Sequence, residues 1–363
     1  MPSLYKFFLG FVCASMTLVT NAQDFPCDEV DKKAIEEASP DKVKRISGFQ
    51  TATPVERANP RYPAEAARTG SEGWVTMSYV INEEGAVEDV IVDDYSGHKA
   101  FRHEAVRALK RWKFDPAMKN GAPTEQCHQA IRIDFLLEDN TGAKRSFIRA
   151  YREIEGLLSE EKFALADEKM AKLEAKRNFN RYESTYFYTL DGKLARRLND
   201  VQRELNSYSK ALNSANQSEF EDAFKADLIR QIFALEVNFG YYALALESFD
   251  KLLELDGAEA YRAELAPVVE EINALIESKS PMSIALAVKD SGSQFYTLTR
   301  NQFGFSYIDG DLDSVEVRCE SHREKFTVAE NFIWSIPQSW GQCRVLIQGE
   351  PGTTFELVEV NNA

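Results

Sequence analysis

Two changes in the spacing of apolar residues, both between residues 73 and 138, constrain the fold of this chain most strongly. Apolar and polar residues alternate from Val75 to Ile81, which is the period of a half-buried strand. The turn sequence "NEEG" leads into a second run with valines at 87, 90 and 92, so the two runs predict a hairpin. From Phe101 to Trp112 apolar residues recur every three or four positions, as on one face of a helix, and alternation returns at residues 131–137. With a short helix after Pro63, the pattern predicts an α-β-β-α-β unit.

The segments that build this unit resemble the C-terminal domain of the TonB family of energy transducers. The resemblance is carried by "RYPAEAARTGSEGWVTMSYVINEEGAVEDVIV", "FRHEAVRALKRWKFDPAMKNGAP" and "QAIRIDFLLE", which occur in the family's order and spacing. It implies a TonB C-terminal-like domain at residues 53–139. Members of the family bind a short N-terminal segment of outer-membrane receptors alongside the last strand of this domain.

The resemblance also implies which residues contact the partner. They are Asn59, Pro60, Arg61, Tyr62 and Pro63 in the entry segment, and Ala130, Ile131, Arg132, Ile133, Asp134 and Phe135 in the last strand. For Pro60 and Pro63 an alternative is open, because proline also marks the start of a helix without any binding role. Trp74, Trp112 and Phe114 are expected to lie in the core.

The first 22 residues have the anatomy of a secretory signal, with one lysine, an apolar run from Phe7 to Val19 and a cut between Ala22 and Gln23. The alternative is an uncleaved anchor, but the run is shorter than the roughly 20 residues that a bilayer-spanning helix needs. The leader and the resemblance predict the periplasm of a Gram-negative bacterium. Inner-membrane proton-driven partners are expected only if the leader stays uncleaved. The chain lacks the Pro-rich arm of a full transducer, which favours partner recognition without force transmission.

Four cysteines follow the leader, and an even set in an oxidising compartment favours disulfides. We predict the pairs Cys27–Cys127 and Cys319–Cys343. The sequence permits two other pairings, and it also permits four buried free cysteines.

The residues outside this unit form three segments with different sequence patterns. Residues 23–52 read as a charged lead-in, and residues 145–278 as helical pairs with a period near 40 residues, with a middle pair in 195–215. These pairs are similar to degenerate tetratricopeptide-type repeats, although a plain helical spacer is the alternative. Residues 280–363 form short β-rich runs that predict a small all-β, sandwich-like domain. The fold class is therefore multidomain α+β.

No catalytic cluster stands out in the sequence. The four histidines are scattered, and there is no phosphate-binding glycine motif, so we expect no enzyme, no cofactor and no metal site. A net charge of -15 argues against a nucleic-acid partner. Two hypotheses remain: a periplasmic TonB-family protein that binds outer-membrane TonB-dependent receptors by strand addition, or a periplasmic adaptor that binds other proteins through its repeats or β domain.

Overall fold

The computed structural model describes residues 49–137, 142–176, 178–215, 220–320, 322–330 and 332–361. Residues Gly48–Ala363 form one compact unit. The predicted leader and most of the predicted lead-in lie outside the described residues. Within the described part, three regions follow one another along the chain, and no helix there is long and apolar enough to span a bilayer.

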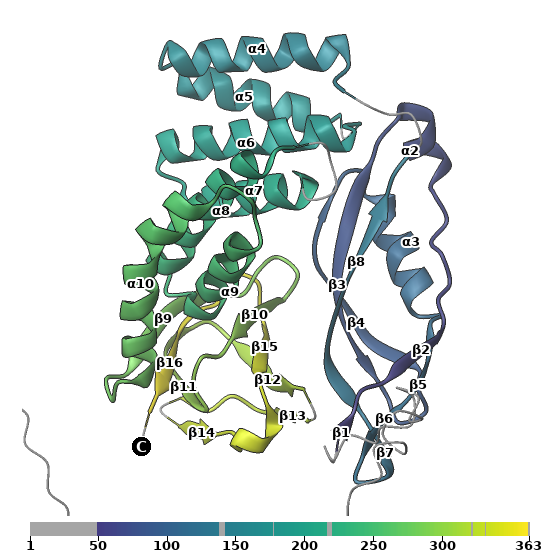
Figure 1. Ribbon diagram of the computed structural model, residues 1–363, viewed down its shortest axis with the longest axis vertical. Helices are drawn as coiled ribbons and strands as arrows, with labels where there is room; N and C mark the ends of the chain where they lie inside the picture. The colour runs from purple at the N-terminus through teal and green to yellow at the C-terminus, as the bar shows by residue number, and fades with distance from the viewer. Residues whose placement is uncertain are drawn as a thin grey trace, which may run out of the picture. The chain divides into compact units, whose positions relative to one another are not determined.

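The first region has the predicted order of elements: α2 (Ala64–Thr69), β3 (Gly73–Ile81), β4 (Val87–Ser96), α3 (Ala100–Leu109) and β8 (Gln126–Phe135). The three long strands form an antiparallel sheet in the order β4-β3-β8 (Figure 1). Short strands accompany it: β1 (Phe49–Gln50), β2 (Thr53–Glu56), β5 (Lys113–Asp115), β6 (Ala117–Lys119) and β7 (Ala122–Thr124).

Helix α3 covers one face of this sheet. Its buried residues Phe101, Ala105 and Leu109 pack in one core with the alternating side chains of β3 from Val75 to Ile81. The predicted core residues Trp74, Trp112 and Phe114 are all buried. The period-2 and period-3.6 patterns therefore identified the inward-facing residues correctly.

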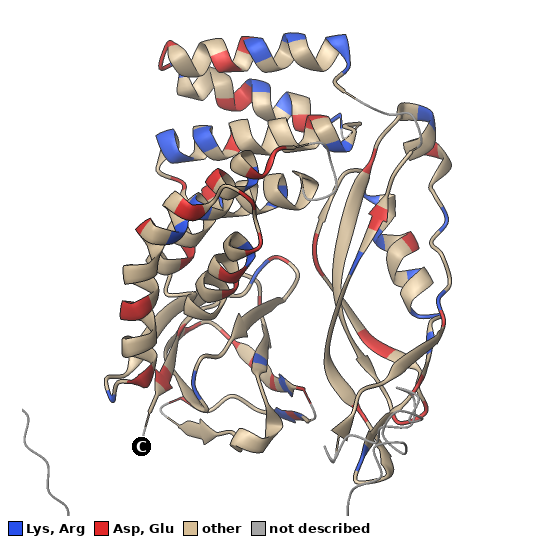
Figure 2. Cartoon of the chain, viewed as in Figure 1, with Lys and Arg blue, Asp and Glu red and all other residues tan. Residues whose placement is uncertain are grey.

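The second region is helical. Its elements are α4 (Arg145–Ser159), α5 (Phe163–Glu174), α6 (Arg181–Leu198), α7 (Val201–Ala215), α8 (Asp222–Asn238), α9 (Tyr242–Leu253) and α10 (Glu259–Glu277). Each helix packs against the next one in the chain, and acidic and basic side chains are interspersed along them (Figure 2). The likeness to tetratricopeptide repeats stays a prediction.

The predicted middle helical pair was placed wrongly within residues 195–215. The pair is α6 and α7, and α6 already begins at Arg181. The reason is a capping box: the Asn180 side chain accepts a hydrogen bond from the Glu183 backbone, and the Glu183 carboxylate accepts one from the Asn180 backbone.

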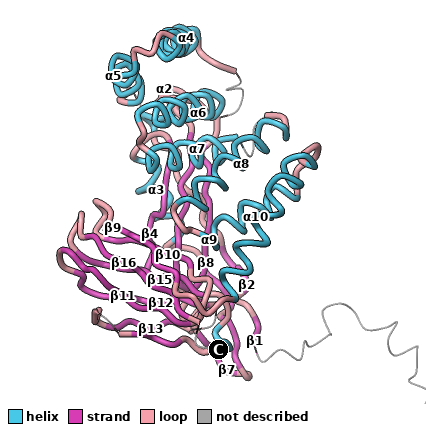
Figure 3. The backbone as a smooth tube through the Cα atoms, turned by 90° about the vertical axis from the view of Figure 1, so that its left-hand side faces the viewer, coloured by secondary structure: helices cyan, strands magenta, loops and turns pink. Residues whose placement is uncertain are grey.

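The third region contains two four-stranded antiparallel sheets, in the orders β10-β15-β12-β13 and β14-β11-β16-β9. The strands β9, β16 and β11 run alongside one another in Figure 3, and buried residues of both sheets form one core. The bounds are β9 (Met282–Ala287), β10 (Ser293–Thr297), β11 (Gln302–Asp309), β12 (Leu312–Cys319), β13 (Arg323–Phe326), β14 (Ile333–Ser335), the 3₁₀ helix η2 (Gln338–Trp340), β15 (Cys343–Gly349) and β16 (Thr354–Val360).

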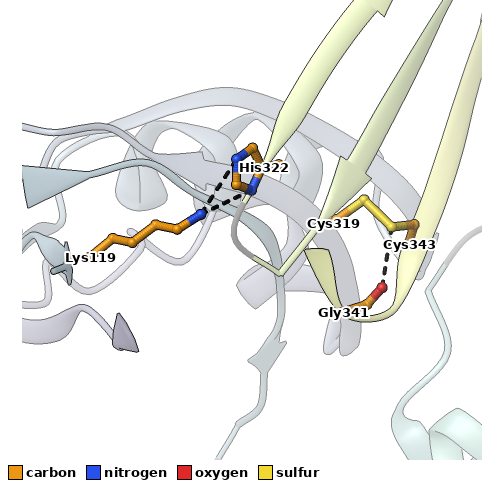
Figure 4. Close-up of a disulfide and its surroundings, with 5 residues drawn as sticks. All are labelled: Lys119, Cys319, His322, Gly341 and Cys343. Carbon is orange, nitrogen blue, oxygen red and sulfur yellow. Dashed lines mark hydrogen bonds between the residues drawn. A yellow bond between two sulfur atoms is a disulfide. The ribbon is translucent and has the colours of Figure 1, made fainter. Parts of the chain in front are cut away.

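The disulfide Cys319–Cys343 is confirmed. The two cysteines face each other across β12 and β15, and the bridge joins residues 24 apart in sequence (Figure 4). In the loop-entropy model, closing a loop of this size stabilises the folded state by roughly 3 kcal/mol.

Gly192 allows helices α6 and α7 to approach each other closely. A Cβ built at Gly192 would lie 2.5 Å from the ring of Tyr208, which is fully buried in α7. Alanine normally stabilises a helix interior by roughly 0.5–1 kcal/mol over glycine, but overpacking a buried ring costs roughly 1–3 kcal/mol. We expect Gly192→Ala to lower the free energy of unfolding, measured in urea by circular dichroism.

Gly156 in α4 is the matched control, because a Cβ there would meet nothing within 4 Å. Gly156→Ala should raise the free energy of unfolding by roughly 0.5–1 kcal/mol. Equal effects of the two substitutions would contradict the close approach of α6 and α7.

Candidate functional site

Strand β8 lies at one end of the three-stranded sheet, and its pairing with β3 is regular except for one register shift between Tyr79 and Ile81. The register runs without interruption from Gly73↔Phe135 to Tyr79↔Gln129. Within the described residues, no strand pairs with the other side of β8. In an antiparallel ladder, alternate residues point their backbone N–H and C=O groups away from the neighbouring strand. Strand β8 therefore presents a straight row of backbone donors and acceptors at the edge of the sheet.

The opposite edge of the sheet is irregular. Pairing of β4 with β3 shifts register twice, between Thr76 and Met77 and between Ser78 and Val80. Asp89 of β4 also has a positive φ of 47°. Because bulges of this kind twist an edge and interrupt its hydrogen-bonding row, β4 is the poorer template for another strand.

Most side chains of the predicted binding residues of β8 are already engaged within the protein. Ile133 and Phe135 are buried in the core, and Phe135 stacks on Phe101 with ring centroids 4.3 Å apart. On the other face, Arg132 and Asp134 form an ion pair at 2.7 Å. Ile131 is partly buried against the α3 core, and Ala130 is exposed.

The predicted entry segment lies beside the Phe135 end of β8. The Tyr62 ring makes edge contacts with Phe101 and Phe135, at centroid distances of 5.6 and 5.9 Å. Its hydroxyl donates to the Ser71 carbonyl at 2.5 Å, and burial, together with the nearby Glu72 carboxylate, raises the pKa of Tyr62. The structure thus brings the two predicted segments together, with Tyr62 as a packing residue.

The other residues of the entry segment differ in exposure. Asn59 and Arg61 are exposed, whereas Pro60 and Pro63 are partly buried. Pro63 is the residue that precedes the first turn of α2. That position fits the simple role of proline at a helix start, which the sequence had left open.

Part of this region is similar to known proteins. The family model described as Gram-negative bacterial TonB protein C-terminal matches residues 58–137. We call this segment the TonB domain.

Curated relatives match a short part of the chain. The chain is 40% identical over 78 residues to the protein tonB2 of Pseudomonas aeruginosa and 32% identical over 73 residues to the TonB protein of Yersinia enterocolitica. These matches cover 22% and 19% of this chain, and the chain spans 28% and 29% of the lengths of those relatives. A solved structure of the tonb2 protein from Vibrio anguillarum is 33% identical, with 28% of this chain and 96% of that chain covered and a TM-score of 0.21.

The face of the sheet away from α3 is covered by the rest of the chain. On the helical side, the Trp74 indole N–H donates to Ser214 of α7 at 3.3 Å, and Lys210 of α7 lies 3.6 Å from Asp94 of β4. The buried Glu72 carboxylate accepts from the backbone N–H groups of Leu137 and Arg181, both at 2.9 Å. Glu72 therefore ties the TonB domain to the first turn of α6, where the helix dipole favours negative charge.

A polar contact, which we call the seam, joins the same sheet face to the third region. The TonB domain supplies Ser78, Asp93 and His128, and the third region supplies Arg318, Arg323 and Arg344. Ser78 donates to Asp93 at 2.6 Å and accepts from Arg344 at 3.4 Å. Arg323 forms ion pairs with Asp89, Glu88 and Glu125.

Polar atoms are buried at the seam without hydrogen-bond partners among the described residues. They are Asp93 Oδ1, His128 Nδ1, Arg318 Nη1 and Arg344 Nε. At the rim, the Lys119 ammonium of β6 points to the His322 ring at 3.4 Å, as Figure 4 shows. Burial and Lys119 lower the pKa of His322. The seam is therefore held by charge and hydrogen bonds, although some of its buried polar atoms lack a partner among the described residues.

Cys127 lies buried in β8, and it has no disulfide partner among the described residues. Burial and the Glu125 carboxylate raise the pKa of this thiol to about 12, so the reactive thiolate is disfavoured. Its predicted partner, Cys27, lies outside the described residues, and the pairing stays a prediction. Within the described part of the chain, no three His, Cys, Asp or Glu side chains are grouped so that they could hold a metal ion.

The seam gives a pH-dependent prediction. Burial raises the pKa of Asp93 more than the Ser78 hydrogen bond and the neighbouring arginine and lysine side chains lower it. A raised folded-state pKa means that the folded protein holds the proton more tightly than the unfolded chain, so this carboxyl destabilises the fold increasingly as the pH rises through that pKa. Asp93→Asn should therefore be more stable than the wild type at pH 8, and the difference should shrink as the pH falls towards 4.

The measurement is the free energy of unfolding in urea across this pH range. Asp115→Asn is the matched control, because Asp115 is exposed on β5. Curves for Asp93→Asn and the wild type that stay parallel from pH 4 to 8 would show that the Asp93 carboxyl is not desolvated at the seam.

Proposed function

We propose that this protein binds an extended peptide of an outer-membrane receptor by strand addition along β8, and that it serves transport across the outer membrane from the periplasmic side. The observation that carries the proposal is the edge of β8 in a TonB domain, where the pairing with β3 is uninterrupted from Gln129 to Phe135. The family resemblance supports the class of partner, since members of the family bind a receptor segment beside the last strand.

Strand addition fits the engaged side chains of β8. Backbone hydrogen bonds contribute roughly 0.5–1.5 kcal/mol each in net free energy, so several of them sum to measurable binding without any pocket in the protein. Side chains of an added strand would alternate between the two faces of the sheet. One set would lie near Tyr62 and the other near the Arg132–Asp134 ion pair, so these residues would modulate sequence preference.

A second candidate function is a periplasmic adaptor without energy transduction. A partly exposed aromatic cluster of α6 and of Phe220, just before α8, favours it, with Tyr182 lying 4.9 Å from Tyr186 and 5.4 Å from Phe220 between ring centroids. An adaptor would bind its partner through such a surface and leave β8 unused. Partner binding that persists while a saturating peptide occupies β8 would favour this candidate.

The test of strand addition uses the full chain labelled with ¹⁵N and a receptor N-terminal peptide at millimolar concentration. We expect amide shifts from Ala130 to Phe135 and none at Ile91 and Val92, which lie on the irregular edge of the same sheet. Two peptides that are N-methylated at alternate residues provide the matched pair. One of them should lose binding, because its methyl groups would face β8, and the other should keep it.

Shifts that are absent from β8, or equal for both methylated peptides, would contradict strand addition. Shifts confined to α6 and α8 would favour the adaptor.

A further inference from the structure

A cavity of about 520 Å³ lies between α9 and α10 on one side and residues 297–301, 336 and 341–343 of the third region on the other. The TonB domain does not line it. Apolar side chains of Leu246, Ile276, Leu298 and Ile336 contribute to its lining beside Cys343 of the disulfide. The size suits one or two side chains of a ligand, and the apolar part suits a hydrocarbon stem.

The one basic side chain of this lining is not free to bind an anion. Arg300 is only 6% exposed, and its guanidinium donates to the backbone carbonyls of residues Leu275, Ile276, Ser278, Ser280 and Glu359. Because these bonds use its donors, Arg300 serves to join α10 to the third region. The remaining polar groups of the lining therefore determine which ligand the cavity can bind.

Those remaining groups favour a cation. Glu247 and Asp250 stand exposed on α9 in the lining, together with the amides of Asn273 and Gln342. Glu247 pairs with Lys251 at 2.9 Å, but both side chains are more than half exposed, and such pairs contribute little. Asp250 forms no ion pair with another described residue. A carboxylate above an apolar surface suits lysine or arginine, whose charged head and apolar stem can both be accommodated.

The cavity lies close to β8. Gln342 and Cys343 of its lining directly precede Arg344, whose guanidinium donates to Ser78, the residue of β3 that pairs with Ala130 of β8. Burial and Arg344 lower the pKa of His128 in β8, and the Gln342 backbone and Glu247 raise it. The cavity therefore lies near the start of β8, at the opposite end from Tyr62 and Phe135.

From this placement we infer that the cavity binds a lysine or arginine side chain of the partner peptide, in the part that continues beyond the strand added to β8. The inference rests on the proposed function and extends it, because it assigns a basic flank to the peptide. Backbone pairing along β8 would give sequence-tolerant binding, and the cavity would select peptides whose flank carries positive charge.

The test compares three peptides on the full chain by isothermal titration calorimetry. They share one extended core and carry a Lys-Lys pair before the core, a Lys-Lys pair after it, or Gln-Gln at both positions. One lysine peptide should bind about 3- to 10-fold more tightly than the glutamine peptide, the range expected for partly exposed charge pairs. The two lysine peptides should differ, because only one end of the core reaches the cavity.

The double variant Glu247→Gln/Asp250→Asn should remove this preference and leave the affinity for the glutamine peptide unchanged. Glu254→Gln is the matched control, since Glu254 is an exposed carboxylate just after α9 and outside the cavity lining. It should keep the preference. A preference that survives the double variant, or equal affinities for all three peptides, would overturn the inference while strand addition stands.

The amide shifts of β8 distinguish failure of the proposed function from failure of the inference alone. If no peptide shifts the amides of β8, strand addition fails, and the inference, which depends on it, is overturned with it.

Discussion

Strand β3 pairs with a strand on each side, and both faces of the resulting sheet are buried. The rest of the structure depends on this constraint. Helix α3 covers one face with an apolar core. Helices α6 and α7 and the third region cover the other through Trp74, Glu72 and the polar seam. Because both faces are occupied, the sheet can recognise an extended partner at its edges alone. Of these, β8 keeps one register from Gln129 to Phe135, whereas the pairing of β4 shifts register twice.

The two covered faces differ in chemistry, and the difference matters for how the regions hold together. The α3 face buries aromatic and aliphatic side chains, which stabilise through removal of apolar surface from water. The seam relies on Arg323, Arg344 and Asp93, with buried polar atoms that lack partners among the described residues. Unpaired buried polar groups cost free energy, so the seam is the weaker of the two contacts and responds to pH.

Much of the TonB domain could be predicted from the sequence because its residues alternate with clear periods. The core residues of β3, the stripe of α3 and the bridge Cys319–Cys343 followed from local spacing and from chain position. The start of α6 did not, because it is set by the capping box at Asn180 and Glu183, which the spacing of apolar residues does not reveal. The sheet edge of the candidate site could be placed by resemblance, but not the role of Tyr62 as a packing residue.

The seam could not be predicted at all. Ser78 and Asp93 look like ordinary polar positions of strands, and Arg318 and Arg344 like ordinary positions of a distant β region. Only the fold brings these residues together, because their contact depends on how three regions pack and not on any local pattern. The cavity beside α9 could not be predicted either, since its lining comes from helices and loops far apart in the sequence.

Amide hydrogen exchange of the full chain, with and without a receptor N-terminal peptide, tests most directly whether the edge of β8 is the recognition surface. The account predicts slower exchange at alternate residues between Ala130 and Phe135, whose N–H groups point away from β3, and unchanged exchange along β4. Protection along β4, or protection of no strand in the sheet while the peptide is bound, would contradict it.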